Sequence, residues 1–361
     1  MTVAVALDYR PAMLRNAGIP RAVRELAHAL AAQPGLLLHL FAHSLAAARR
    51  SDRLPANARL HRLPIPGRSL PLLRRCGLGA DRLAGGASVF HWTDYVYPPV
   101  TRAVPVLTVH DLAFARDPSF HGRAQADELL RRTRGAAALA RAIIVPSAAT
   151  AEDVRAVLQP TAPVHVVPFG VDHVPEVTGP HPLGGQPYAL AIGTVEPRKN
   201  HLRLLAAWQR LPRPRPLLVV VGRTGWECEA AAQALLAAQS DGDLRWYERA
   251  SDPTIWGLLA HAEVLLYPSL YEGFGFPPLE AMALGVPVVA GDRPAIRESC
   301  DDAALYCEPT DESSIAAAIE RALGDVPLRT ELCARGRRRA ARFTWNACAR
   351  AHAAIYREVA G

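Results

Sequence analysis

The chain has 361 residues, 50% of them hydrophobic and 21% charged, with a formal net charge of +7. The length suits about two domains of ordinary size, and the apolar content excludes a disordered chain. An apolar run of about 18 residues, which would span a membrane, does not occur. The start of the chain has no basic segment ahead of its apolar stretch, and the six cysteines form no CxxC pair. Both features predict a cytoplasmic protein with reduced thiols.

The basic charge lies in the first half of the chain. Residues 1–180 carry 21 Arg against 13 acidic residues, whereas residues 181–361 carry 20 basic against 21 acidic residues. This asymmetry predicts an anionic partner, either a phosphate-bearing molecule or a membrane surface. Arginine-rich codon usage is the alternative. It explains why 40 of the 41 basic residues are Arg and only Lys199 is lysine, but it does not explain why the two halves differ.

Short apolar runs alternate with amphipathic stretches along the chain. In the first half, strands are expected at 2–8, 36–42, 88–92, 105–109, 142–146 and 164–167, with helices at 19–33, 125–140 and 148–158. In the second half, strands are expected at 188–193, 217–222, 263–268, 286–290 and 305–308, with helices at 200–210, 226–239, 252–261, 277–284, 311–323, 327–342 and 344–359. Continuous apolar strands separated by helices predict an α/β protein with doubly wound parallel sheets.

The alternation pauses at residues 175–187, where four prolines and three glycines interrupt the apolar pattern. Such a segment is typical of a linker. It predicts a Rossmann-like domain over residues 1–180 and a second one over residues 181–343, followed by a last helix over residues 344–361. Because ligands of open parallel sheets bind at the carboxyl ends of the strands, two such domains facing each other would form a central cleft.

Residues 268–289, PSLYEGFGFPPLEAMALGVPVV, combine two acidic side chains with the start of a helix. Gly273 and Gly275 allow the backbone to approach a ligand closely, and the two prolines that follow suit the first turn of a helix. The amino end of that helix favours a phosphate, with Glu272 before it and Glu280 about one turn inside it. The alternative is a pair of surface glutamates beside an ordinary turn, which the complete string disfavours.

A basic motif lies in residues 192–208, IGTVEPRKNHLRLLAAW. A strand is expected to end at Gly193, and a helix to begin near Asn200, a favourable N-cap residue. Arg198 and Lys199 precede the cap, where a planar guanidinium and a compact ammonium can together hold a diphosphate. A solvated pair on a turn is the alternative, but the placement of the one lysine of the chain favours a binding site.

The 268–289 segment resembles the signature of the retaining glycosyltransferases of family 4, which have the GT-B fold. The family pattern is Glu-Gly-Phe-Gly, a proline, Leu-Glu-Ala-Met-Ala and Gly-x-Pro-Val-Val, and this sequence departs from it in its doubled proline. The resemblance implies that Glu272 binds hydroxyls of the donor sugar and that Glu280 binds the ribose of the nucleotide. It also implies that the amides of Phe274 and Gly275 contact the sugar and the phosphate.

Other segments add donor contacts by the same resemblance. The string GTVEPRKN resembles the diphosphate motif of the family, which implies roles for Gly193, Arg198 and Lys199. Arg249 falls in a loop that lies by the base in the family. Gly18, within residues 15–26, corresponds to a glycine-rich loop whose amide approaches the donor phosphate from the other domain.

The first half of the chain also contributes candidate residues. His110 follows an expected strand, where a histidine can donate to a sugar hydroxyl or to the leaving oxygen. A satisfied structural histidine is the alternative, and the match of HDL at residues 110–112 to the family favours the functional role. His91 and Asp94 lie in a loop that resembles one lining the cleft, which implies contact with the acceptor. In this fold the last helix crosses back to the first domain, with Trp345, Ile355 and Tyr356 as expected anchors.

The resemblance implies a transferase that moves a sugar from a nucleoside diphosphate sugar to a hydroxyl of a carbohydrate or lipid-linked acceptor, with retention of configuration. The strings GTVEPRKN and VGRTGW favour mannosyl transfer from GDP-mannose in lipopolysaccharide or exopolysaccharide assembly. No cofactor, metal ion or nucleic-acid partner is expected. A GT-B-like sugar-nucleotide epimerase and a non-catalytic sugar-nucleotide-binding protein remain as alternatives.

Residues 68–83, RSLPLLRRCGLGADRL, mix leucines with arginines. Such a stretch can lie on an anionic bilayer, with apolar side chains inserted and arginines at the level of the headgroups. The alternative is a short amphipathic helix packed on its own domain. The first interpretation predicts peripheral contact with the inner face of the membrane.

Overall fold

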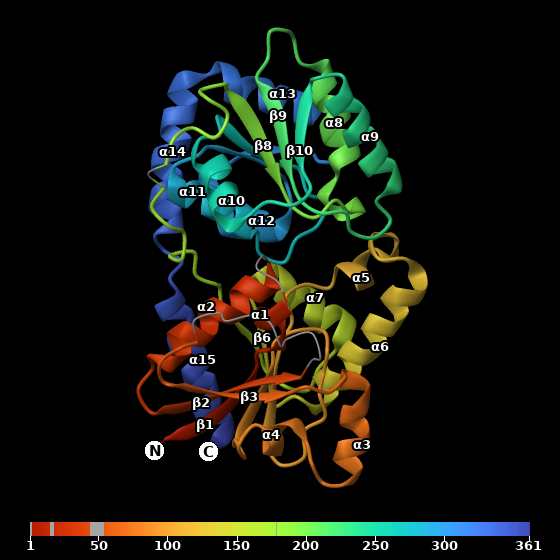
Figure 1. The fold of residues 1–361 in the computed structure, drawn as a ribbon, viewed down its shortest axis with the longest axis vertical. Helices are drawn as coiled ribbons and strands as arrows, with labels where there is room; N and C mark the ends of the chain where they lie inside the picture. The colour runs from red at the N-terminus through yellow and green to blue at the C-terminus, as the bar shows by residue number, and fades with distance from the viewer. Residues whose placement is uncertain (1, 15–17, 44–53, 178) are drawn as a thin grey trace. The chain divides into compact units, whose positions relative to one another are not determined.

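The computed structural model describes residues 2–14, 18–43, 54–177 and 179–361. The chain forms two compact units (Figure 1). Unit 1 contains Met1–Leu112, Asp127–Gly170 and Phe343–Gly361, and unit 2 contains Ala113–Ala126 and Val171–Arg342. The main part of unit 2 begins at Val171, which is ten residues before the predicted boundary between residues 180 and 181. A short excursion, residues 113–126, also belongs to unit 2.

Unit 1 is built on a seven-stranded parallel sheet in the order β3-β2-β1-β4-β5-β6-β7. The strands are β1 Val3–Asp8, β2 Leu36–His43, β3 Ala58–Leu63, β4 Val89–Trp92, β5 Val104–Thr108, β6 Ala142–Val145 and β7 Val164–Val166. The helices are α1 Arg10–Leu14, α2 Ile19–Ala31, α3 Leu70–Arg75, α4 Ala80–Leu83, α6 Arg123–Leu139, α7 Ala148–Leu158 and α15 Trp345–Ala360, with a 3-10 turn, η2, at Gly67–Ser69. The first turn of α6 counts with unit 2.

Unit 2 is built on a six-stranded parallel sheet in the order β10-β9-β8-β11-β12-β13. The strands are β8 Tyr188–Ile192, β9 Leu217–Val221, β10 Leu244–Tyr247, β11 Val264–Tyr267, β12 Val288–Gly291 and β13 Leu305–Cys307. The helices are α5 Ala113–Arg116, α8 His201–Arg210, α9 Glu229–Ser240, α10 Asp252–Ala260, α11 Phe276–Leu284, α12 Pro294–Cys300, α13 Glu312–Gly324 and α14 Val326–Ala340. The 3-10 turns are η3 Pro118–Phe120, η4 Pro197–Lys199 and η5 Asp301–Ala303.

Both sheets are doubly wound, which confirms the predicted fold class. In each sheet the chain first builds toward one edge and then returns to the centre to build toward the other. The direction changes between β1 and β4 in unit 1, and between β8 and β11 in unit 2. At such a change the connections leave the two central strands on opposite faces of the sheet, and a crevice opens outside their carboxyl ends.

The two strands that the sequence prediction missed, β3 and β10, both lie at an edge. β3 pairs with β2 alone and β10 with β9 alone. The six residues of β3, ARLHRL, are all partly or fully exposed. An edge strand is half solvated and often carries charges that prevent pairing with another chain. β3 contains Arg59 and Arg62 and β10 contains Arg245, so both lack the continuous apolar run by which the other strands were predicted.

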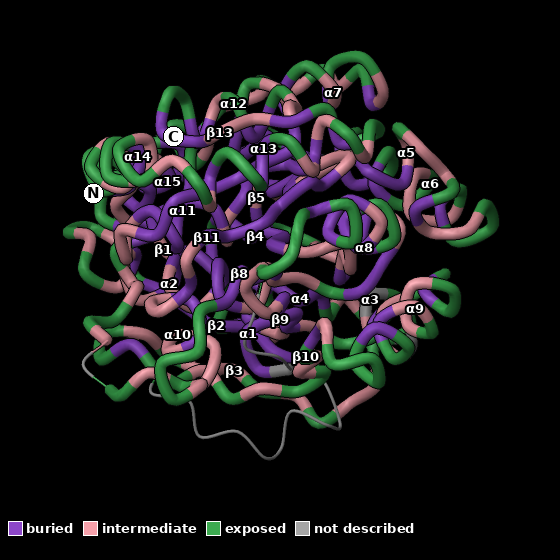
Figure 2. Tube along the Cα trace, turned by 90° about the horizontal axis from the view of Figure 1, so that it is seen from above, coloured by how far each residue is buried: buried purple, intermediate pink, exposed green. Residues whose placement is uncertain are grey.

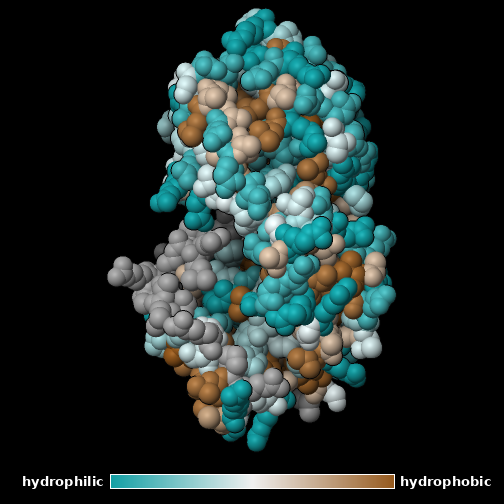
Figure 3. All heavy atoms as spheres, turned by 90° about the vertical axis from the view of Figure 1, so that its right-hand side faces the viewer, coloured by the Kyte–Doolittle hydropathy of each residue, from teal (hydrophilic) through white to brown (hydrophobic). Residues whose placement is uncertain are grey.

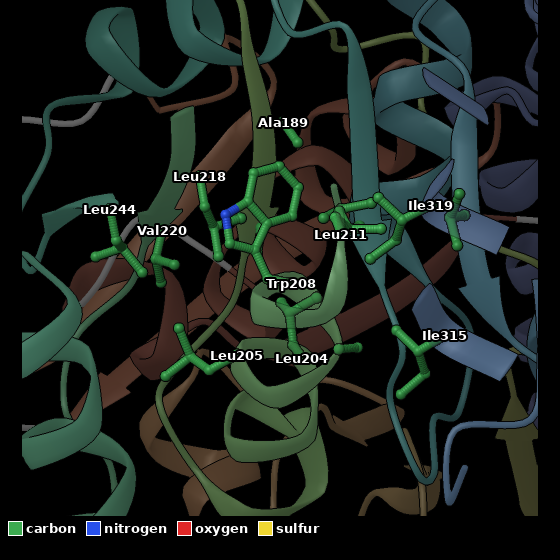
Figure 4. Packing of buried hydrophobic residues seen from close by; sticks show 14 of the residues in the cluster. Ala189, Leu204, Leu205, Trp208, Leu211, Leu218, Val220, Leu244, Ile315 and Ile319 are labelled. Atoms are coloured by element: carbon green, nitrogen blue, oxygen red, sulfur yellow. The ribbon is translucent and has the colours of Figure 1, made fainter. Parts of the chain in front are cut away.

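Buried residues follow the central strands of each sheet, whereas exposed residues lie on the surrounding helices and loops (Figure 2). In unit 2 a buried cluster joins α8, α9 and α13 to the sheet. Trp208 of α8 is 1% exposed and lies among Leu218 and Val220 of β9 and Ile319 of α13 (Figure 4). Removing such a side chain leaves a cavity that costs about 3–5 kcal/mol. This cluster therefore fixes α8, whose first turn follows the basic motif.

The last helix, α15, packs within unit 1. Trp345, Ile355 and Tyr356 are at most 5% exposed. The hydroxyl of Tyr356 lies 2.7 Å from Nδ1 of His91. A Cβ atom on Gly170 would lie 2.2 Å from the backbone nitrogen of Trp345. The absence of a side chain at residue 170 therefore lets the start of α15 approach the chain closely.

Residues 68–83 do not form one amphipathic helix. They contain η2, α3 and α4, with Gly77 in the left-handed region between the two helices. Leu70 is 2% exposed, whereas Leu72 is 63% exposed. The segment thus buries one leucine and presents another to solvent. On the face shown in Figure 3, hydrophobic residues form several small groups among hydrophilic ones.

Over the residues with described positions, no helix combines the length and apolar character that crossing a bilayer requires. The six cysteines are free thiols, and four of them are buried.

Candidate functional site

The candidate site of unit 2 lies at the point where its sheet changes direction. The segment after β8 carries the basic motif, and the segment after β11 carries Glu272 and the glycines. Since β8 and β11 are neighbours and parallel, their carboxyl ends lie side by side. The topology therefore brings together residues that are more than 70 positions apart in the sequence.

Arg198, Lys199 and Glu272 form one ion-pair cluster. Nη1 of Arg198 lies 2.8 Å from Oε2 of Glu272, and Nζ of Lys199 lies 2.6 Å from Oε1 of the same carboxylate. Arg198 also contacts Glu196, with Nη2 2.8 Å from Oε1. Lys199 further donates to the hydroxyl of Tyr267, the last residue of β11, over 2.6 Å. These contacts, which the sequence did not predict, hold both cations close to one point.

The cluster is buried, and its electrostatics follow from that. The side chains of Arg198, Lys199 and Glu272 are 16%, 11% and 7% exposed. Burial alone would raise the pKa of Glu272, but the charges of Arg198 and Lys199 outweigh it and lower the pKa to about 2. Burial lowers the pKa of Lys199, and the charge of Glu272 opposes that effect. Glu272 is therefore an anion at every pH at which the protein would work.

Glycines make the close packing of this cluster possible. A Cβ atom on Gly193 would lie 3.3 Å from Cδ and Cε of Lys199, so the lysine stem passes directly over the glycine. Gly275, the N-cap residue of α11, has a φ of 101°, and a Cβ atom there would lie 2.7 Å from Cδ1 of Ile296. Both positions require glycine for this backbone and side-chain arrangement.

Asn200 precedes α8 as predicted, but its side chain does not cap the helix. Its φ is 65°, and its side chain makes no cap hydrogen bond. Nδ2 instead donates to the carbonyl oxygens of Pro268, at 3.0 Å, and Pro309, at 2.6 Å. Asn200 is thus the N-cap residue of α8 as predicted, but it does not stabilise the helix through a side-chain cap. Asn200 ties the loops after β11 and β13 to the start of α8, and this fixes the residues on either side of it.

The amino end of α11 has fewer free amides than an ordinary helix start. The helix begins at Phe276, and Pro277 and Pro278 follow. Proline has no N–H group, so among the first three helical residues only Phe276 has an amide to donate. The backbone amides that could bind a phosphate at this end of α11 are therefore those of residues Gly273–Phe276. Phe274 is buried and packs against Phe276 with ring centroids 5.2 Å apart.

Glu280 lies inside α11 and is 4% exposed. Its Oε1 lies 3.1 Å from Nε2 of His173. Arg249, in contrast, lies exposed in the loop after β10, two strands from β8. None of the interactions described for the chain joins Arg249 to Arg198, Lys199 or Glu272. The structure therefore groups all the predicted donor residues of unit 2 around β8 and β11 except Arg249.

Gly18 and His110 belong to unit 1. Gly18 is the N-cap residue of α2 with a φ of 66°, and residues 15–17 of the predicted loop lie outside the described part of the chain. Nε2 of His110 lies 2.8 Å from the carbonyl oxygen of Thr93. Because a carbonyl oxygen only accepts, Nε2 carries the proton and Nδ1 is left as an acceptor. Burial lowers the pKa of His110, and with Nε2 donating to Thr93 the ring nitrogen left for a ligand is Nδ1.

The predicted acceptor contact of His91 is wrong. The side chain is fully buried, with Nδ1 2.7 Å from the hydroxyl of Tyr356 and Nε2 2.7 Å from Oγ1 of Thr108. Both ring nitrogens are therefore used inside unit 1. The sequence pattern of an apolar strand ending in a histidine does not distinguish a residue that closes a buried network from one that faces a ligand.

Unit 1 has its own polar cluster where its sheet changes direction, at the carboxyl ends of β1 and β4. Nη2 of Arg10 lies 2.6 Å from Oδ2 of Asp94, and the backbone N–H of Arg10 donates to Oδ1 of Asp8. Asp8 is fully buried, and its Oδ2 has no hydrogen-bond partner among the described residues. Burial raises the pKa of Asp8 to about 7. Asp94 was predicted, whereas Asp8 and Arg10 were missed, although their place at the end of an apolar strand and just after it was a signal.

No group of three or more His, Cys, Asp or Glu side chains in the described ranges is arranged to hold a metal ion. What the cluster around β8 and β11 offers is two cations, a carboxylate and glycine backbone. This set can bind a molecule that carries both phosphate and hydroxyl groups.

Comparisons with known proteins agree with this chemistry. The family models "Glycosyltransferase Family 4" and "Glycosyl transferases group 1" match residues 17–174 and 178–339. The "O-antigen chain mannosyltransferase B" of Escherichia coli is 32% identical over an alignment of 276 residues that covers 71% of this chain and 72% of that protein.

Two solved structures show a similar fold. Sucrose-phosphate synthase from Thermosynechococcus elongatus matches with a TM-score of 0.80 at 21% identity and covers 99% of both chains. Anabaena HepE in complex with UDP and glucose matches with a TM-score of 0.74 at 17% identity, over 99% of this chain and 100% of that one. At these identities the likeness concerns the fold alone.

Proposed function

Since the chain belongs to the glycosyltransferases of family 4, we propose that it transfers a mannosyl residue from GDP-mannose to a hydroxyl group of a growing polysaccharide. Mannosyl transfer is supported by the relative in Escherichia coli, which is named an O-antigen chain mannosyltransferase. That name also supports a place in lipopolysaccharide or exopolysaccharide assembly, with a carbohydrate or lipid-linked acceptor.

The observation that carries the proposal is the cluster of Arg198, Lys199 and Glu272 after β8 and β11. In the proposed complex, the guanidinium and ammonium groups bind the diphosphate of the donor. The carboxylate of Glu272 then accepts hydrogen bonds from the hydroxyls of the sugar. Glu280 binds the ribose, and the backbone at Gly273–Phe276 approaches the sugar and the phosphate.

The proposed reaction retains the configuration of the donor sugar. The bond between the anomeric carbon and the phosphate oxygen breaks, and the acceptor oxygen bonds to that carbon on the same face. The departing phosphate oxygen takes the proton of the acceptor hydroxyl, so neither a protein nucleophile nor a metal ion has a part in the scheme. Arg198 and Lys199 stabilise the negative charge that develops on the diphosphate.

On unit 1, we assign the acceptor contacts to Asp94 and Arg10, with His110 as a hydrogen-bond acceptor for a sugar hydroxyl. Asp94 is 22% exposed in its side chain and Arg10 is 12% exposed. A carboxylate and a guanidinium side by side match the acceptor and donor atoms of a sugar hydroxyl pair.

A sugar-nucleotide epimerase or a non-catalytic binding protein is less well supported. The matched relative is named a transferase. The cations and glutamates of the family motifs are all in place around β8 and β11. An epimerase would also need acids placed for proton abstraction, and the sequence offered no further candidates for this role.

The donor assignment can be tested by thermal shift with GDP, UDP, ADP and dTDP, because a ligand that binds only the folded protein raises the melting temperature by mass action. We expect GDP to give the largest shift, and GDP-mannose to be turned over with a mannose-terminated oligosaccharide as acceptor. A shift with UDP alone would overturn the choice of nucleotide. No shift with any of the four would overturn the donor site itself.

A further inference from the structure

Glu280 has a buried partner that neither the sequence nor the family resemblance identified. His173 lies 107 residues before it, yet Nε2 of His173 is 3.1 Å from Oε1 of Glu280. Both side chains are 6% exposed. A carboxylate oxygen can only accept, so the ring nitrogen carries the proton and donates.

Aromatic contacts hold the ring of His173 in this place. Its centroid lies 6.0 Å from the ring of Trp256 in α10 and 6.4 Å from that of Phe276, both in edge-to-face geometry. Phe276 and Glu280 are four residues apart in α11, so they lie on the same face of the helix. His173 therefore covers one turn of α11 and contacts both ends of that turn.

We propose that His173 is a positioning residue that fixes the carboxylate of Glu280 for the ribose of the donor nucleotide. The inference rests on the proposed ribose-binding role of Glu280. A buried carboxylate is costly unless it is hydrogen-bonded, and the bond from His173 satisfies one oxygen and limits rotation of the side chain. The hydroxyls of the ribose then meet a carboxylate already in its binding orientation, so less conformational entropy is lost on binding.

The place of His173 in the chain adds to its role. Unit 2 resumes at Val171, and His173 is the third residue after the chain leaves unit 1. The segment that connects the two units thus contributes a side chain directly to the nucleotide site. A change in the conformation of residues 171–175 would move His173, and Glu280 would lose a partner.

The test compares binding of a nucleoside diphosphate with binding of its 2′,3′-dideoxy analogue. GDP is the probe, or whichever of UDP and ADP the wild-type protein binds more tightly. For His173→Ala we expect GDP affinity to fall about tenfold, the scale of a weakened hydrogen bond to a charged group. Affinity for the dideoxy analogue, which has no ribose hydroxyls to offer Glu280, should change less than about twofold.

Two further variants separate positioning from a general structural role. His173→Gln keeps an N–H donor at a similar reach and should restore most of the GDP affinity. In a Glu280→Gln background, His173→Ala should have little additional effect, because both substitutions remove the same interaction. His261→Ala is the matched control, since His261 lies 3.3 Å from the carbonyl oxygen of Gly179, a few residues beyond the connecting segment, and none of the described interactions joins it to Glu280.

The outcomes distinguish this inference from the proposed function. If Glu280→Gln weakens GDP but His173→Ala does not, the positioning role is overturned and the ribose assignment stands. Equal losses for GDP and its dideoxy analogue in His173→Ala, with no rescue by glutamine, would also overturn it, since that is the pattern of a general structural defect. If Glu280→Gln leaves GDP affinity unchanged, the ribose-binding role of Glu280 is overturned, and the positioning role of His173 is overturned with it.

Discussion

At the scale of single residues, the charges of the proposed donor site are already paired within the protein. The two cations that we assign to the diphosphate contact Glu272, and Arg198 also contacts Glu196, at 2.6–2.8 Å. A bound diphosphate must therefore compete with Glu272 for the same charges. Glu272 thus has two effects in this account: it binds the sugar hydroxyls of the donor, and it weakens the binding of anions that bring no sugar.

Glu272→Gln keeps the shape of the side chain and removes the competing charge. We expect pyrophosphate and GDP to bind about tenfold more tightly, the scale of one partly screened charge interaction, while mannosyl transfer is lost. Isothermal titration measures the first effect and release of GDP from GDP-mannose the second. Glu312→Gln, which removes the partner of the exposed Arg210, should change neither. Weaker binding of pyrophosphate to the Glu272 variant would contradict the competition.

Asp8 gives a prediction for pH. Its pKa is raised by burial to about 7 from an ordinary value of 3.8. The folded protein therefore holds a proton on Asp8 that the unfolded chain releases, and stability is lost as the pH rises from about 4 to about 7. Asp8→Asn removes this loss, so it should raise the free energy of unfolding more at pH 8 than at pH 5. The rise in the pKa of Asp8 by about three units sets an upper limit of about 4 kcal/mol on the stability lost over the whole range from pH 4 to pH 7.

Urea denaturation of the wild type and Asp8→Asn at the two pH values measures this difference. If the variant is instead destabilised more at pH 8 than at pH 5, Asp8 is an ionised partner of Arg10. The account of a buried neutral acid would then be wrong.

The sequence predicted the members of the donor cluster but not their mutual contacts. The motifs placed Arg198, Lys199 and Glu272 after two strands, and doubly wound order brings the ends of such strands together. The pairing of His173 with Glu280 could not be predicted in this way, because a lone histidine in a proline-rich segment carries no period or spacing. The role of His91 could not be predicted either, since only the packed structure shows that both of its ring nitrogens have partners inside unit 1.

At the scale of elements, the turns after β8 and β9 hold the basic motif in place. A Cβ atom on Gly222, which follows β9, would lie 1.8 Å from the carbonyl oxygen of Gly193. An alanine there must displace the segment that leads from β8 to Arg198 and Lys199. The central strands were predictable from their apolar runs, but this contact between their ends was not, because glycine in a sequence does not reveal what approaches it.

Gly222→Ala should therefore lower the free energy of unfolding by about 1–3 kcal/mol, as overpacking does, and weaken GDP binding as well. Chemical denaturation and titration with GDP check the two effects. Gly257→Ala is the control, because Gly257 lies inside α10 and a Cβ atom there meets nothing within 4 Å. That substitution should leave binding unchanged and raise stability by up to about 1 kcal/mol. Normal GDP affinity in Gly222→Ala would show that the turn does not position the cations.

At the scale of the whole molecule, the excess of positive charge in residues 1–180 indicates a further anionic partner. Residues 1–180 carry an excess of eight positive charges, whereas the proposed donor residues of unit 2 lie in the half with an excess of one negative charge. The proposed donor residues of unit 2 therefore do not explain the excess of arginine in residues 1–180. We propose a weak contact with anionic lipid, which would bring the protein to a lipid-linked acceptor.

Liposome sedimentation tests this contact. We expect binding to vesicles that contain phosphatidylglycerol at low salt, and none to neutral phosphatidylcholine vesicles, because each surface arginine adds about 1 kcal/mol at most and salt screens it. Leu72 and Arg75 are exposed on α3, so the double variant Leu72→Ser/Arg75→Ser should bind less while still acting on a soluble acceptor. Equal binding by the variant and the wild type would exclude this segment as the contact.

The measurement that tests the central claim most directly is mannosyl transfer from GDP-mannose by the wild type, Arg198→Ala and Lys199→Ala, with folding checked by thermal unfolding. Arg210→Ala is the matched control, since Arg210 lies in α8, close in sequence to both cations, and pairs with the exposed Glu312. We predict that Arg198→Ala and Lys199→Ala each remove about 2–4 kcal/mol of transition-state stabilisation and so lower turnover strongly. The control should keep its activity. Near-normal turnover by both site variants would contradict the account.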